Sequence, residues 1–80
     1  MPTVKKIGPY RLFFYSNEND EPPHVHVERD RGSSTAKFWI RPVEFAKSHG
    51  FSMVQLRAIR QIVEGMEAQI EKAWRDHFGR

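Results

Sequence analysis

The apolar residues of this 80-residue chain change their spacing halfway along the sequence, and this change constrains the fold more than any other feature. Up to about residue 42 they alternate with polar residues, which is the period of a strand with one buried face. From residue 52 they recur every three or four residues, as in an amphipathic helix. Because a chain this short buries one core, we predict a single α+β domain over residues 1–80, β-rich over 1–42 and helical over 52–78.

Turn residues divide the first half into runs of strand-forming residues. Gly8-Pro9 and the segment 30–34 are typical turns, and Pro42 is expected to end or bulge the last strand. The runs rich in β-branched and aromatic residues are 4–7, 11–15, 24–29 and 35–40. We therefore predict a small, mainly antiparallel sheet of three or four strands, packed against the helical half.

The second half begins with a helix-start signal. Ser52 precedes Gln55 by three residues, the spacing of a capping box. The helical period then continues to Phe78, and a single helix of that length would measure about 40 Å, more than a domain of this size can cover. We favour one long helix, kinked or split near Gly65, over a helical hairpin. The overhang predicts a homodimer or a hetero-complex through the C-terminal helix.

Composition excludes several classes of protein. The chain has no cysteine, which rules out disulfides, thiolate zinc sites and cysteine nucleophiles and is typical of a reducing compartment. It also lacks an apolar run of about 18 residues, so we expect a cytoplasmic protein that does not enter membranes. The net charge is +3, and acidic residues are concentrated between residues 17 and 31. This distribution is compatible with RNA or with an acidic protein partner.

The segment Pro22-Pro23-His24-Val25-His26-Val27-Glu28 carries the residues of greatest chemical interest. In an extended strand, alternate side chains share a face and lie roughly 6.6 Å apart. We therefore expect His24, His26 and Glu28 to point together into solvent, and the two valines to enter the core.

The same alternation assigns faces to the neighbouring strands. Ala36, Phe38 and Ile40 are expected to point inward. The histidine face would then also carry Lys37, Trp39 and Arg41 from the next strand and, in the pairing that we favour, Arg11, Phe13 and Tyr15 from the aromatic strand.

Four interpretations of this face remain open from the residues alone. His24 and His26 could bind a metal with Glu28 as third ligand. They could instead act as acid and base in metal-independent RNA cleavage, which needs no cofactor, with cationic side chains stabilising the developing charge. The face could also bind RNA or a protein without cleavage, through Arg11, Tyr15, Lys37, Trp39 and Arg41. Finally, the histidines could be structural, hydrogen-bonded to Glu18, Asp20 or Glu21.

Several of these motifs together resemble an uncharacterised family of short bacterial proteins, catalogued as a domain of unknown function. The motifs are Pro22-Pro23-His24-Val25-His26-Val27, Ala36-Lys37-Phe38-Trp39, Gly50-Phe51-Ser52 and the closing Ala73-Trp74 with Phe78-Gly79. The resemblance implies a toxin–antitoxin-like pair with a small protein encoded by a neighbouring gene, and an RNA target. It implies no catalytic residues, although His24 and His26 lie in the signature.

Overall fold

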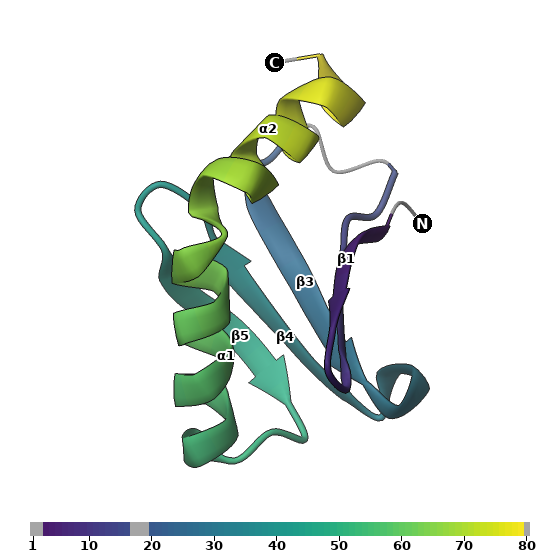
Figure 1. Ribbon diagram of the computed structural model, residues 1–80, viewed down its shortest axis with the longest axis vertical. Helices are drawn as coiled ribbons and strands as arrows, with labels where there is room; N and C mark the ends of the chain where they lie inside the picture. The colour runs from purple at the N-terminus through teal and green to yellow at the C-terminus, as the bar shows by residue number, and fades with distance from the viewer. Residues whose placement is uncertain (1–2, 17–19, 80) are drawn as a thin grey trace.

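The computed structural model describes residues 3–16 and 20–79, which form an α+β domain (Figure 1). Its five antiparallel strands lie in the sheet in chain order, β1 to β5. The strands are β1 (Thr3–Ile7), β2 (Tyr10–Phe13), β3 (His24–Arg29), β4 (Ser34–Trp39) and β5 (Glu44–His49). A short 3₁₀ turn, Asp30–Gly32, joins β3 to β4, and the helices are α1 (Met53–Gly65) and α2 (Glu67–Phe78). The predicted α+β class is confirmed. Glu18, which was proposed as a hydrogen-bond partner of the histidines, lies outside the described residues.

The prediction of three or four strands was wrong because it missed β5. This strand is at the edge of the sheet, and most of its side chains are exposed, so it has no buried face to produce alternating apolar residues. Its register also shifts: Lys47 lies opposite Lys37, but Phe45 lies opposite Phe38, which leaves Ala46 as a bulge. The bulge interrupts the period of two. Pro42 lies in the turn before β5.

The capping box predicted at the start of the helical half is confirmed. The backbone N–H of Gln55 donates to the hydroxyl oxygen of Ser52 at 3.1 Å, and the backbone N–H of Ser52 donates to Oε1 of Gln55 at 2.9 Å. These bonds satisfy two backbone donors that the first turn of a helix leaves without partners. Helix α1 therefore begins directly after Ser52, as the spacing predicts.

The helical half is two helices rather than one long helix, and the break falls at Gly65, where a kink or split was predicted. Helix α1 ends at Gly65, Met66 has a non-helical backbone, and α2 continues at an angle to α1 without folding back as a hairpin (Figure 1). The longest dimension of the domain is 33 Å, shorter than the roughly 40 Å of the single helix considered above. Ile70 and Trp74 of α2 are buried in the chain's own core. The overhang that favoured a partner on the C-terminal helix is therefore absent.

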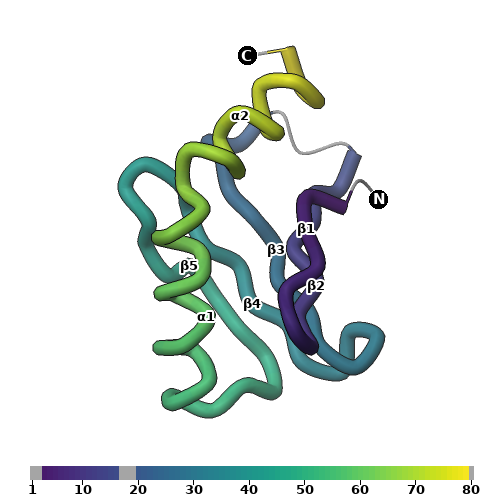
Figure 2. The backbone as a smooth tube through the Cα atoms, in the orientation of Figure 1, coloured from purple at the N-terminus to yellow at the C-terminus, as the bar shows by residue number. Residues whose placement is uncertain are grey.

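Both helices pack on the same side of the sheet, as the backbone trace also shows (Figure 2). Val25 and Val27 of the central strand point into this layer, together with Phe38, as the alternation predicts. The buried core also contains Leu12, Phe14, Ala36, Ile40, Val43, Ile59, Val63, Ile70 and Trp74. The other side of the sheet is not covered by a helix within the described residues, and we call it the open face.

Alanine substitutions at two glycines test the fold, because they are expected to change the free energy of unfolding in opposite directions. Gly50 has a φ of +86°, and a Cβ there would lie 2.9 Å from the carbonyl oxygen of Ser33. We expect Gly50→Ala to lower the free energy of unfolding by about 2 kcal/mol or more, from left-handed strain and this contact. Gly65 has no atom within 4 Å of an added Cβ, so Gly65→Ala should raise it by roughly 0.5–1 kcal/mol. Urea denaturation measures both; equal stability of the two variants would contradict the fold.

Candidate functional site

The strand register determines which side chains share the open face. In an antiparallel pair, directly opposed residues point to the same side of the sheet. Phe13 lies opposite His26, and His26 lies opposite Lys37 on the next strand. Arg11 lies opposite Glu28. The aromatic strand therefore contributes the set that contains Arg11, as the sequence predicts.

His24 is an exception on the open face, because its side chain is buried. It has 0 % exposed surface, and its ring centroid lies 4.9 Å from that of Trp74 and 5.6 Å from that of Trp39. Its Nδ1–H donates to the carbonyl oxygen of Pro22 at 2.9 Å. The expectation that both imidazoles point into solvent is wrong for His24, because α2 brings Trp74 over the start of β3. His24 is therefore not part of the accessible surface of the open face.

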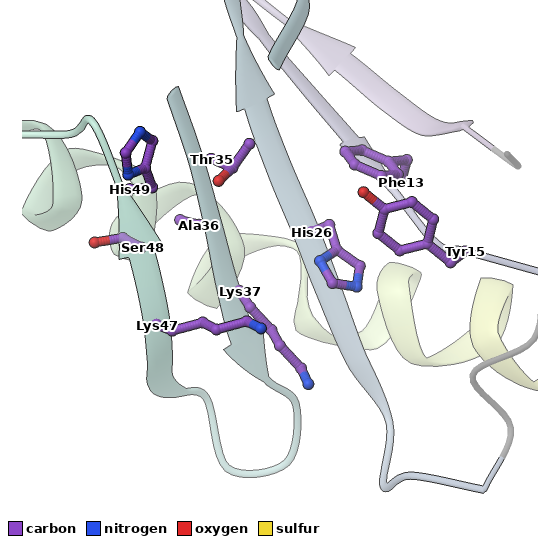
Figure 3. Close-up of a pocket in the computed structure, with 9 residues that line it drawn as sticks. All are labelled: Phe13, Tyr15, His26, Thr35, Ala36, Lys37, Lys47, Ser48 and His49. Atoms are coloured by element: carbon purple, nitrogen blue, oxygen red, sulfur yellow. The ribbon is translucent and has the colours of Figure 1, made fainter. Parts of the chain in front are cut away.

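His26 lies at the centre of the open face and remains partly exposed. Its ring stacks on Phe13 at a centroid distance of 5.4 Å and meets the ring of Tyr15 nearly edge-on at 4.7 Å. Tyr15, just after β2, is 42 % exposed. Figure 3 shows the three rings grouped on one side of the face. The group presents an accessible aromatic surface with polar edges.

Two lysines lie beside this aromatic group, on β4 and β5. Lys37 and Lys47 are directly opposed, and Figure 3 shows their side chains extending over the same part of the face. The Lys37 ammonium donates to Oε1 of Glu21 at 2.6 Å and lies 4.4 Å from the ring centre of Trp39. Lys47 forms no ion pair with any residue of 3–16 or 20–79. Glu21 therefore offsets the charge of Lys37, whereas Lys47 leaves a positive charge beside the aromatic group.

The aromatic group and the lysines line one hollow of about 340 Å³. Its walls are Phe13, Tyr15, His26, Thr35, Ala36, Lys37, Lys47, Ser48 and His49. Three of these residues, Lys47, Ser48 and His49, belong to β5 and were missed with it. Recognition of a strand after Val43 would have placed Lys47 beside Lys37.

The remaining predicted cations are engaged elsewhere. Arg11 pairs with Glu28, with 2.7 Å between Nη1 and Oε1. Arg41 was expected on the histidine face, but its backbone turns with a φ of 67° and its Nε lies 3.2 Å from Oε2 of Glu71 on α2. Arg41 therefore does not belong to the site. Trp39 is partly buried beneath Lys37 and beside His24.

The predicted metal ligands do not converge. Glu28 is held by Arg11, and His24 is sealed beneath the two tryptophans. In the described part of the chain, no three histidine, aspartate or glutamate side chains gather in a way that could hold a metal ion. The proposed set of His24, His26 and Glu28 is therefore not assembled. The open face instead offers aromatic surface and positive charge, which are suited to stacking and to binding anions.

None of the helices in the described residues is both long enough and apolar enough to cross a membrane. In comparisons with known proteins, no curated protein and no solved structure matches the chain. A family model described as "Domain of unknown function (DUF4160)" matches residues 10–75, from the start of β2 into the last turns of α2. The chain therefore belongs to this family of domains of unknown function.

Proposed function

We propose that the open face binds single-stranded RNA, and that the chain is the RNA-binding component of a toxin–antitoxin-like pair in the cytoplasm. The observation that carries the RNA proposal is the hollow in which exposed Tyr15 and His26 lie beside Lys37 and Lys47. Exposed aromatic rings next to cationic side chains are a common means of binding unpaired nucleotides.

The aromatic group supports base stacking. Tyr15 is the most exposed of its rings, while Phe13 packs beneath and His26 packs beside it. Because the ring contacts hold Tyr15 in place, little conformational entropy is lost when a base stacks on it. Stacking of a base on an aromatic side chain contributes about 1–3 kcal/mol.

The lysines support contact with the phosphate backbone. Strands in a sheet lie about 4.8 Å apart, so the distance from Tyr15, after β2, to Lys47, on β5, is on the order of 14 Å across the sheet. A short oligonucleotide spans this distance, with a base on Tyr15 and a phosphate near the lysines. Single strands are the form of RNA whose bases are free to stack.

Binding is favoured over the alternative of metal-independent cleavage. A ribonuclease that uses His24 and His26 together would require both imidazoles to reach the scissile phosphodiester. His24 has no exposed surface and donates its Nδ1 proton to Pro22. Only His26 of the pair is accessible to an RNA on the open face.

The proposed protein partner is a small protein encoded by a neighbouring gene. This part of the proposal rests on the family resemblance, which implies paired genes. Since the apolar side chains of α2 already pack in the core, the C-terminal helix no longer provides a reason to place the partner there.

Two substitutions on the open face test RNA binding. We expect Tyr15→Ala to weaken binding by about 1–3 kcal/mol, or roughly 5- to 150-fold, because it removes the stacking surface. Lys47→Ala should weaken binding at low salt and reduce the slope of log K against log[salt] by about 0.7, the loss of one phosphate contact. Fluorescence anisotropy with a labelled single-stranded oligoribonucleotide of mixed sequence measures both effects.

Matched variants control for these changes. Tyr15→Phe keeps the ring and should bind like the unmodified protein. Lys72→Ala removes the same charge from the exposed surface of α2, where Lys72 pairs with Asp76, and should leave the affinity nearly unchanged. If Lys72→Ala weakens binding as much as Lys47→Ala, the RNA responds to net charge alone and the open face is not the site.

The two histidines should separate stability from binding. His24→Ala removes a buried ring packed against two tryptophans and should lower the free energy of unfolding by about 2–4 kcal/mol. His26→Ala should cost less than about 1 kcal/mol and weaken RNA binding instead. Urea denaturation and anisotropy on the same samples measure the two effects. A stable His24→Ala variant with impaired binding would show that His24 contacts the ligand.

Co-expression tests the proposed pair. We expect the chain to co-purify with the product of the neighbouring gene, and one of the two proteins to relieve growth inhibition by the other. Growth curves and affinity purification of the untagged partner are the measurements. Normal growth with either gene alone, together with separate elution of the two proteins, would contradict the toxin–antitoxin-like pair while leaving the RNA proposal intact.

A further inference from the structure

A second hollow lies on the helix-covered side of the sheet, between β5 and α1. It has a volume of about 420 Å³, and its lining residues are Phe38, Phe45, Ser48, Phe51, Met53, Leu56, Arg57 and Arg60. Phe45 is 47 % exposed and Met53 is 67 % exposed, although both are large apolar side chains. These exposed apolar side chains make the hollow a candidate interaction surface.

The hollow adjoins an edge of the sheet that can accept another strand. In the described chain β5 pairs only with β4, so the backbone groups along its other side face outward. A strand added at this edge would lie next to the hollow. An occupant that supplies both backbone pairing and an apolar side chain would therefore fit better than one that supplies either alone.

Because of the bulge at Ala46, the residues at both ends of β5 point to the same face of the sheet. Glu44 and His49 lie opposite Trp39 and Thr35 and therefore belong to the open face. Phe45 lies opposite Phe38, and Ser48 lies opposite Ala36, so both belong to the helix-covered face. At each end of β5, the outermost residue lies on the open face and the next residue lies on the helix-covered face. Two copies of β5 in antiparallel orientation can therefore match on both faces.

We propose that the occupant is a second copy of this chain, paired antiparallel through β5 with Phe45 opposite Ser48 of the partner subunit. Because Ser48 lines the hollow, each Phe45 then packs over the hollow of the other copy. On the open face, Glu44 lies opposite His49 of the partner subunit, an acidic group against a basic one. Lys47 remains directed over its own sheet beside Lys37 (Figure 3).

The other edge of the sheet does not have this complementarity. Strand β1 has the sequence TVKKI, with Lys5 and Lys6 and no acidic residue. A second copy paired at β1 would bring these lysines close together with no acidic side chain to offset them. Strand β5 also carries a lysine, but in the proposed register Lys47 lies opposite Ala46 of the partner subunit. Pairing through β5 is therefore favoured by charge. It does not depend on RNA binding, although it would join two open faces into one continuous surface.

Sedimentation velocity at roughly 0.1 mM tests the dimer, since an interface with a Kd near 1 µM is saturated at that concentration. We expect a dimer for the unmodified chain. Ser48→Arg places a large charged side chain opposite Phe45 of the partner subunit and should give a folded monomer, as judged by circular dichroism. Ser33→Arg introduces the same side chain at an exposed position between β3 and β4 and should remain dimeric.

Engineered cysteines test the register, because the chain has none of its own. We expect Glu44→Cys and His49→Cys to form a disulfide when the two variants are mixed and oxidised, since directly opposed Cβ atoms are about 4.5–5.5 Å apart. Each variant alone should cross-link poorly, because its two cysteines would be on the order of 15 Å apart. A monomer at every concentration, a dimer that persists in Ser48→Arg, or equal cross-linking of single and mixed variants would each overturn the proposal.

Discussion

The packing of Val25 and Val27 against the helices is the constraint on which the rest of the structure depends. Strand β3 is the middle strand of the sheet, and both valines are buried in the main core. Because side chains alternate along a strand, burial of the valines places His26 and Glu28 on the other side. A slip of one residue would put the polar side chains into the core, so the register of the central strand is strongly specified.

Near the end of the central strand and at the edge of the sheet, burial of a side chain does not follow from the alternation of faces. At the start of β3, His24 is buried against Trp74 and bonded to the Pro22 carbonyl, although it belongs to the open face by alternation. At the far edge, β5 has no second neighbour, and Phe45 stays half exposed although it points to the helix side. Alternation therefore predicts the direction of a side chain, whereas burial depends on which elements reach it.

The open face combines features that are costly for stability. Lys37 and Lys47 are directly opposed, and Tyr15 is a large aromatic side chain left partly in water. A domain of this size has a small margin of stability, so such features support the proposed RNA binding. The ion pairs of Arg11 with Glu28 and of Lys37 with Glu21 hold the surrounding side chains in position.

The sequence alone was sufficient for the class of fold, the inward residues of β3 and β4 and the start of the first helix, because each depends on local periodicity or on a capping motif. The local pattern could not predict β5, whose exposed and bulged strand has no regular period. It also could not predict that Trp74, fifty residues after His24, would seal that histidine, or that Arg41 would turn away to Glu71. These features result from contacts between distant segments, so only the tertiary structure decided which of the predicted site residues meet on one surface.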